Sequence, residues 1–352
     1  MIMVVCLHTF GWGGLVESAL VPGTYNWYLG NMMHALSLQA VNCFVLISGY
    51  FLCTSKFKLS KLVTTWMQIL FYSVGIAVLL QIFHEGTPFS VKELIKCALP
   101  FTLDRYWFAT DYLLLYMTFP FFNLAIRAMN QKTHFFFCVL SFVLFSLLPN
   151  VIYISDFSAV QGGYSYVWFC VLYLFASYIR LYVSRRVKHQ NRMFPIYVIT
   201  ALVICGERFL AHYITPYIFG GVRLTSLFYS YNSIVSVFCA LALFQTFRGI
   251  DIRGKALNKM IRFIAPLTFA VYLIHEHGLL RPVIWELFNP GKTAEQPYMV
   301  LYVIGCVILI FVCCCAVEWI RQLVFKVIRI DRFVKTICDS LQSKIQDKFP
   351  TT

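Results

Sequence analysis

The chain has 352 residues, of which 60% are hydrophobic and 12% are charged, and its formal net charge is +14. This composition excludes a soluble globular protein and predicts one polytopic membrane protein. The positive charge does not indicate nucleic acid as a partner. The Lys and Arg residues gather at the ends of long apolar runs, where they set the topology and meet anionic membrane lipids. Continuous apolar runs, rather than alternating residues, favour helices over a closed barrel.

The apolar runs predict an all-α transmembrane bundle of about ten crossings, since a helix needs roughly 20 residues to cross the hydrocarbon. In chain order we expect crossings at 1–16, 34–54, 62–83, 106–126, 135–154, 165–183, 194–213, 225–246, 264–287 and 298–320. A short amphipathic helix at 90–99 follows the third crossing. We assign residues 1–320 to a membrane domain and residues 321–352 to a basic, helix-prone tail at the inner membrane surface.

The distribution of Lys and Arg predicts which side of the membrane each gap faces. Every second gap is poor in them, and of the 29 Lys and Arg these gaps hold only Lys92, Lys96, Arg105, Arg208, Arg223, Arg281 and Lys292. The basic gaps are assigned to the cytoplasm, and both termini are therefore predicted to be cytoplasmic. The first apolar run starts at Met1 without a basic inner flank, so we expect a first helix that is shortened at its N-terminus.

His8 is the first candidate for catalysis. It stands alone in the apolar segment MIMVVCLHTF, and an ionisable residue inside a membrane is costly and usually functional. A neutral imidazole can take a proton from a hydroxyl group as a general base. The alternative is a histidine that only hydrogen-bonds a neighbouring helix. The thirteen cysteines lie mostly in apolar runs without a CxxC pair, and we interpret them as packing residues.

The second apolar run and the segment after it supply four further candidates. Asn42 must find a polar partner inside the bundle, and Ser48-Gly49 permits close helix approach. Lys58 and Lys61 form a cationic segment that could bind phosphate groups on the cytoplasmic side. Packing alone would also explain Ser48, and the positive-inside rule alone would explain both lysines.

Polar and aromatic residues at the outer helix ends are candidates for binding a sugar acceptor. Trp107 and Asp111 enter the fourth crossing from the outside. Near the outer end of the seventh crossing, Glu207 and Arg208 could form an ion pair or part of an outward cleft. Interfacial aromatic residues and structural ion pairs are the alternative explanation.

The ninth crossing contains two histidines, His275 and His277, separated by one residue. They do not predict a zinc site, because residues two apart on a helix point to different faces. We expect one of them, His275, to face the bundle interior, because it directly follows the apolar run, and we count it among the candidates for binding the substrate. No metal site is predicted.

Several segments together carry a family resemblance. They are VVCLH at the start, NCFVLISGYFL in the second run, KLSK before the third, YWFATDYLLLY in the fourth and VYLIH in the ninth. In this order the chain resembles the acyltransferase 3 family of integral membrane acyltransferases, which includes bacterial polysaccharide O-acetyltransferases. The resemblance covers almost the whole chain.

The resemblance implies transfer of an acyl group, expected to be acetyl, from cytoplasmic acyl-CoA (acetyl-CoA) to a hydroxyl of a cell-surface or lipid-linked glycan. The protein would lie in the cytoplasmic membrane of a bacterium. His8 would be the family's essential histidine, as a base or a transient acyl carrier, and Asn42 or Ser48 would orient it or polarise the carbonyl. Lys58 and Lys61 would contact the coenzyme A phosphates. The basic residue that the family carries before this histidine would fall upstream of Met1.

The alternative is a non-enzymatic transporter of a glycan or lipid, or an inactive truncated homologue. Transporters more often contain discontinuous helices in two corresponding halves, and the sequence has no such pairing.

Overall fold

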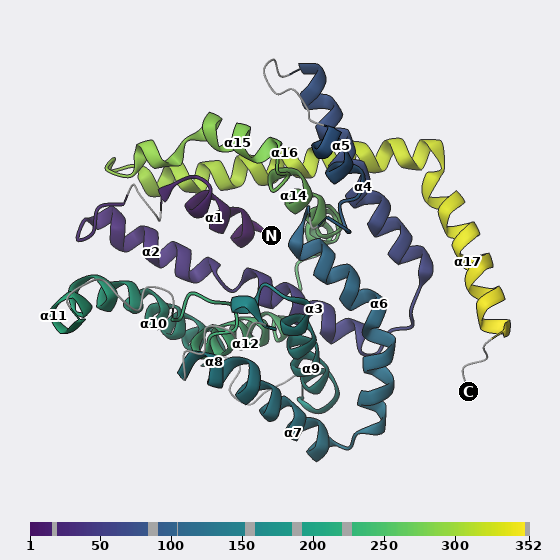
Figure 1. The fold of residues 1–352 in the computed structure, drawn as a ribbon, viewed down its shortest axis with the longest axis horizontal. Helices are drawn as coiled ribbons and strands as arrows, with labels where there is room; N and C mark the ends of the chain where they lie inside the picture. Colours follow the sequence, from purple (N-terminus) through teal and green to yellow (C-terminus); the bar gives the residue numbers. More distant parts are fainter. Residues whose placement is uncertain are drawn as a thin grey trace.

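The computed structural model describes residues 1–15, 20–83, 91–103, 105–151, 159–184, 192–219 and 227–348, and within these ranges the chain is helical and contains no strand. The all-α class is thus confirmed. Figure 1 shows α16 running across the molecule and α17 turning away from its end. The helices are α1 (Ile2–Gly11), α2 (Tyr25–Ser37), α3 (Ala40–Leu52), α4 (Leu59–Phe83), α5 (Val91–Ala98), α6 (Trp107–Ala128), α7 (Gln131–Phe142), α8 (Leu148–Val151), α9 (Tyr166–Tyr182), α10 (Met193–Tyr213), α11 (Thr215–Phe219), α12 (Ile234–Arg248), α13 (Lys255–Ile264), α14 (Thr268–His275), α15 (Leu280–Phe288), α16 (Met299–Ile328) and α17 (Ile330–Lys348).

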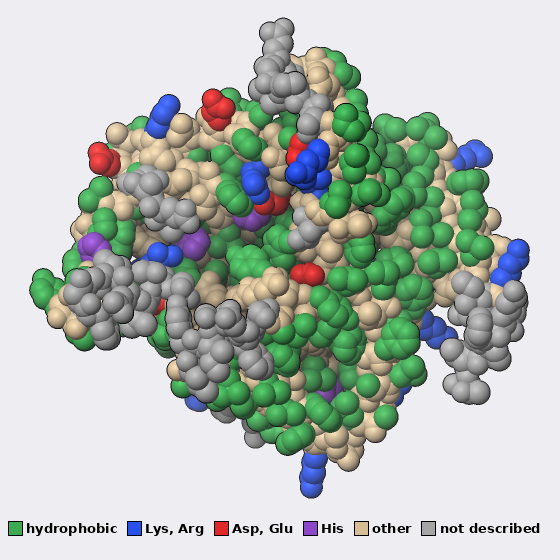
Figure 2. Space-filling model, in the orientation of Figure 1, with side chains coloured by type: hydrophobic (Ala, Val, Ile, Leu, Met, Phe, Trp, Pro, Cys, Tyr) green, Lys and Arg blue, Asp and Glu red, His purple; other side chains and the backbone are tan. Residues whose placement is uncertain are grey.

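Six helical stretches in the described ranges are long and apolar enough to cross a membrane. They are 25–52, 59–83, 131–151, 193–213, 255–275 and 299–328, and α1, α9 and α12 are shorter apolar helices. The surface suits contact with lipid, because Phe83, Leu301 and Val327 are 79%, 73% and 80% exposed, and hydrophobic side chains cover much of the face in Figure 2. Several membrane spans are therefore confirmed, while the count of about ten and the position of the termini stay predictions.

The second predicted crossing begins earlier than expected. α2 and α3 are almost continuous, so the apolar stretch starts at Tyr25 and not at residue 34. Polar residues near the start of α2 hid this earlier beginning in the apolar pattern, and they have hydrogen-bond partners inside the protein. Asn26, for example, donates hydrogen bonds of 2.8 Å to the carbonyls of Ala294 and Gln296, as buried amides generally must.

The ninth predicted crossing, 264–287, is two helices rather than one, since α14 ends at His275 and α15 begins at Leu280. Pro282 opposes a continuous helix, because it lacks an N–H group and its ring would meet the carbonyl four residues earlier. His277 stabilises the break: its Nδ1 accepts the backbone N–H groups of Leu279 at 3.3 Å and Leu280 at 3.4 Å. The break leaves Glu276 at the C-terminal end of α14.

The predicted close approach at Ser48-Gly49 is found between α3 and α9. A Cβ atom at Gly49 would lie 2.9 Å from Cβ of Ala176 and 3.1 Å from Cα of Tyr173. Only glycine therefore allows this helix spacing, which is the role small residues play between membrane helices.

A buried carboxylate joins α4 to α16. Glu318 is fully buried and accepts hydrogen bonds from Tyr72 at 2.6 Å and from Arg321 at 2.7 Å. Here α16 continues to Ile328, past the predicted end of the tenth crossing at 320. α17 then packs against α4, and Gln342 bonds the backbone N–H of Leu59 at 2.9 Å.

Candidate active site

His8 lies near the C-terminal end of α1, which packs against α2 and α16. The chain that follows is fixed by two glycines. The carbonyl of Gly13 accepts the N–H of Gly291 at 3.0 Å, and a Cβ at Gly13 would lie 2.9 Å from the ring of Pro290. Gly14 has a φ of +74°, which only glycine adopts without strain. These contacts hold the end of α1, and with it His8, in one position.

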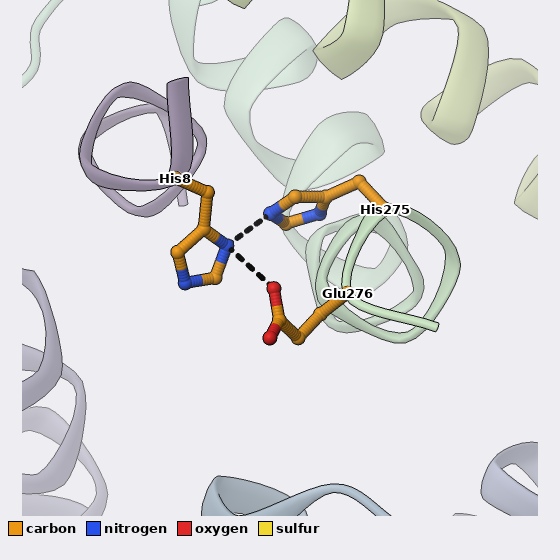
Figure 3. A group of neighbouring side chains, drawn as sticks. All are labelled: His8, His275 and Glu276. Atoms are coloured by element: carbon orange, nitrogen blue, oxygen red, sulfur yellow. Dashed lines mark hydrogen bonds and ion pairs between the residues drawn. The ribbon is translucent and has the colours of Figure 1, made fainter. Parts of the chain in front are cut away.

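Three side chains meet at the ends of α1 and α14. Figure 3 shows His8 facing His275 and Glu276. Nδ1 of His8 lies 2.8 Å from Nε2 of His275 and 3.1 Å from Oε2 of Glu276. His275 is fully buried, whereas the side chain of His8 is 21% exposed. The fold therefore brings the predicted residues His8 and His275 into direct contact.

The hydrogen bonds assign the protons on both imidazole rings. Nδ1 of His275 bonds the carbonyl of Val271. Because a carbonyl only accepts, this nitrogen carries a hydrogen and Nε2 of His275 is an acceptor. His8 must then donate from Nδ1, which leaves a lone pair on its Nε2. In Figure 3 that nitrogen points away from both neighbours, so His8 presents a basic atom away from the contact.

Arg281 fixes the carboxylate of this group. Its Nη1 lies 2.7 Å from Oε1 of Glu276, and its guanidinium lies 3.7 Å from the ring centre of Trp12. The other carboxylate oxygen is thereby directed at His8. A histidine whose Nδ1 faces an oriented carboxylate and whose Nε2 is available has the geometry of a general base.

A cavity of about 650 Å³ adjoins this group, and His8, Glu276 and Arg281 line it. We call it the outer cavity, because Arg105, Arg208 and Arg281 in its lining come from gaps predicted to face outwards. Much of the remaining wall is aromatic: Trp12, Tyr106, Trp107, Phe108, Tyr164, Tyr229, Tyr231 and Tyr272. In Figure 2, basic, acidic and histidine side chains gather near the middle of one face, among hydrophobic ones.

A second cavity, of about 590 Å³, is mostly apolar and contains Arg180 and Arg248 in its lining. We call it the inner cavity, since both arginines belong to basic bands predicted to be cytoplasmic. Met1, Ala40 and Phe44 line both cavities. The two cavities therefore adjoin one another beside α1.

Asn42 and Ser48 lie apart from His8. Asn42 is fully buried, donates to the carbonyl of Tyr231 at 2.8 Å and accepts from the indole of Trp168 at 2.9 Å. Ser48 donates to the carbonyl of Phe44 within its own helix at 2.9 Å. Neither residue lines the outer or the inner cavity. The contacts of Asn42 join α3 to other segments, as expected for a polar residue inside the bundle, whereas the bond of Ser48 stays within α3.

Lys58 and Lys61 are both exposed, and neither is among the residues that line the two cavities. Their segment is bound to the tail, because Gln342 donates to the carbonyl of Phe57 at 3.1 Å. The cations that line the inner cavity are Arg180 and Arg248, which the sequence did not single out.

The predicted outer residues divide into two groups. Trp107 and Arg208 line the outer cavity, whereas Asp111 and Glu207 do not. Glu207 is buried, and its carboxylate accepts the backbone N–H groups of residues 227 and 228. Glu207 thus supports the cavity wall. Arg223, the other predicted outer cation of this region, lies outside the described residues.

A family model described as an acyltransferase domain matches residues 1–318 of the chain. The chain belongs to the acyltransferase 3 family. It is therefore an enzyme, an acyltransferase that acts on hydroxyl groups, and with its membrane-spanning helices a multi-pass membrane protein. No match was found among curated proteins or among solved structures.

The site of this acyltransferase also offers three possible metal ligands, since donor atoms of His8, His275 and Glu276 lie within 4.8 Å of one another. The spacing is that of a hydrogen bond. Two ligands of one tetrahedral zinc ion would be separated by about 3.4 Å, given bonds of about 2.1 Å, and the two histidine nitrogens are 2.8 Å apart. Arg281 also already neutralises Glu276.

Sequence reasoning missed Glu276 and Arg281 as members of the site. The signal was present, because Glu276 is an acidic residue directly after His275 at the end of an apolar run. Its role depends on the break between α14 and α15, which the apolar pattern did not reveal. His277, in contrast, faces α4, where its Nε2 bonds the carbonyl of Ser73 at 3.0 Å.

Proposed function

We propose that this acyltransferase transfers an acetyl group from cytoplasmic acetyl-CoA to a hydroxyl of a cell-surface or lipid-linked glycan in the cytoplasmic membrane of a bacterium. The observation that carries the proposal is the contact of His8 with Glu276 and His275 at the wall of the outer cavity. It supplies a neutral base whose protonated form would lie beside a carboxylate.

In the proposed reaction, Nε2 of His8 takes the proton of the acceptor hydroxyl as its oxygen forms an ester bond to the acyl carbon. The thioester C–S bond breaks, and the proton passes from His8 to the departing sulfur. Glu276 stabilises the imidazolium that exists between these events, and Arg281 holds Glu276 in place. His275 keeps the proton of neutral His8 on Nδ1, which is the tautomer that a base at Nε2 requires.

We propose the inner cavity as the donor side. Its apolar walls suit the acyl and pantetheine chain, and Arg180 and Arg248 suit phosphate groups. Arg248 already donates to the carbonyls of Val183 at 2.9 Å and Ser184 at 2.7 Å, which fixes its guanidinium at the end of α9. Lys58 and Lys61, exposed at the surface, remain candidates for an outlying phosphate contact.

The test is acetyl transfer by the purified protein in lipid nanodiscs, with acetyl-CoA and bacterial surface glycan as substrates. The variant His8→Ala should lower kcat by about 10²–10⁴-fold, the usual contribution of a general base. His212→Ala is the matched control, because His212 lies on α10 and lines neither cavity. Glycan acetylation by His8→Ala at the normal rate would overturn the assignment.

Base catalysis and an acyl-histidine intermediate are separated by omitting the acceptor. We expect the intact mass of the protein to stay unchanged after incubation with acetyl-CoA alone, because a base forms no covalent bond. An acetyl adduct that maps to His8 and transfers to added glycan would show a nucleophile instead.

A further inference from the structure

Three of the few cations predicted on the outer side, Arg105, Arg208 and Arg281, line the outer cavity. The positive-inside rule disfavours cations on this side, so their convergence needs another explanation. Arg281 is accounted for by its ion pair with Glu276. The other two guanidinium groups have no comparable role in the reaction.

Arg105 is held so that one edge of its guanidinium stays unused. Its Nη1 pairs with Oε2 of Glu93 at 3.1 Å, and the other oxygen of Glu93 takes Lys96 at 2.6 Å. The hydrogen bond from Lys96 and the charges of Lys96 and Arg105 hold the pKa of Glu93 below its ordinary value. The carboxylate that holds Arg105 is therefore charged at neutral pH. Nε and Nη2 of Arg105 have no acceptor among the described residues. These two atoms form the edge that binds carboxylate or phosphate side-on.

Arg208 is oriented by stacking. Its guanidinium lies 4.4 Å from the ring centre of Tyr229, which in turn stacks on His34 with ring centres 5.3 Å apart and an interplanar angle of 16°. The neighbouring Glu207 uses both carboxylate oxygens on backbone N–H groups. Nε of Arg208 has no acceptor within the described ranges. A buried donor without a partner is costly, and a bound anion would remove that cost.

The wall of the same cavity offers flat aromatic surfaces. Trp107 and Tyr164 have ring centres 4.7 Å apart, and Tyr164 and Tyr231 have ring centres 4.8 Å apart. Such rings can pack against the apolar faces of a sugar, in the way that aromatic side chains commonly line ligand pockets. The carboxylate of Glu276 would repel an anionic ligand in this cavity, but its ion pair with Arg281 offsets that repulsion.

We propose that the acceptor sugar carries a negatively charged group, a carboxylate or a phosphate ester, which binds Arg105 and Arg208 in the outer cavity. The sugar ring packs against the aromatic wall, and the hydroxyl to be acylated lies toward His8. The proposal rests on the proposed function in one respect: it takes the outer cavity as the acceptor side.

Binding tests the proposal without turnover. Trp12 and Trp107 line the cavity, so quenching of tryptophan fluorescence can report binding. The protein in nanodiscs of neutral lipid is titrated with methyl glucuronide, glucose 1-phosphate and uncharged methyl glucoside. We expect a charged sugar to bind about 10- to 100-fold more tightly than the glucoside, the usual effect of a charge-assisted hydrogen bond. The preference should disappear in Arg105→Gln and Arg208→Gln.

Lys92→Gln is the matched control, because Lys92 is an exposed outer cation that does not line the cavity. It should keep the preference. A stronger preference for glucuronide assigns a carboxylate to the acceptor, and one for glucose 1-phosphate assigns a phosphate. Equal binding of all three sugars, no binding of either charged sugar, or an equal loss of preference in Lys92→Gln would overturn the proposal.

Acetyl transfer separates this inference from the proposed function. If charged sugars bind through Arg105 and Arg208 but no sugar or glycan is ever acetylated, the proposed function fails and the anion site stands. If glycans are acetylated while the two variants lower kcat/KM equally for charged and uncharged acceptors, the anion site fails and the proposed function stands.

Discussion

Glu276→Gln removes a negative charge beside His8 while it keeps the size of the side chain. Oε2 of Glu276 lies 3.1 Å from Nδ1 of His8, and opposite charges at this separation attract by about 5 kcal/mol when the effective dielectric constant is about 20. The cation of Arg281, 2.7 Å from the same carboxylate, offsets part of this attraction, so we take about 3–5 kcal/mol as the loss. At about 1.4 kcal/mol per tenfold change in rate, kcat should fall by roughly two to four orders of magnitude.

The assay is acetyl transfer in nanodiscs, with released coenzyme A measured by chromatography because the protein contains free cysteines that react with thiol reagents. KM for acetyl-CoA should change little, since Glu276 acts on the protonated histidine and not on the bound donor. Glu286→Gln, the same substitution at an exposed position of α15, is the control. A Glu276→Gln enzyme that keeps more than about a tenth of the wild-type kcat would refute the assigned role of the carboxylate.

The remaining predictions concern packing, the buried carboxylate and metal dependence. Gly49→Ala should destabilise the protein by about 1–3 kcal/mol through overpacking. The control Gly75→Ala should be neutral, because no atom lies within 4 Å of the added Cβ. Equal melting temperatures of the two variants in detergent would contradict the α3–α9 contact. Glu318→Ala leaves the largely buried Arg321 without its partner and should cost about 3–5 kcal/mol, measured by thermal unfolding against the exposed control Glu286→Ala. An unchanged melting temperature would show that the pair contributes nothing. Dialysis against a chelator should leave the transfer rate unchanged, because the two histidines have hydrogen-bond spacing, and activity lost to the chelator and restored by zinc would contradict this.

Part of the site could be predicted from the sequence, because an ionisable residue inside a membrane is costly and therefore stands out in an apolar run. His8 stands in an apolar helix, and such a residue needs a partner. His275 was named for the same reason, and the structure places the two 2.8 Å apart. The roles of Asn42 and Ser48 were implied by the family resemblance and stay predictions; in the structure Asn42 bonds the carbonyl of Tyr231, and Ser48 bonds a carbonyl within its own helix.

The inner cavity shows what counting charges along the sequence cannot predict. The bands of Lys and Arg predicted topology, and within them the KLSK segment was the natural phosphate site. The structure lines the inner cavity with Arg180 and Arg248 from two other bands. A cluster of Lys and Arg in the sequence indicates only that a helix end is basic. Which of its cations faces a cavity depends on how the helices pack.

The helical membrane fold and the acyltransferase family can be predicted from the sequence, because hydrophobic length and charge bias are local properties and the family match extends over residues 1–318. The surroundings of His8, in contrast, depend on contacts between distant parts of the chain. The break after α14 turns Glu276 toward a histidine 268 positions earlier, at 3.1 Å, and packing of α1 against α16 holds the two together. Such long-range contacts depend on how the helices pack, and no local pattern of residues encodes that.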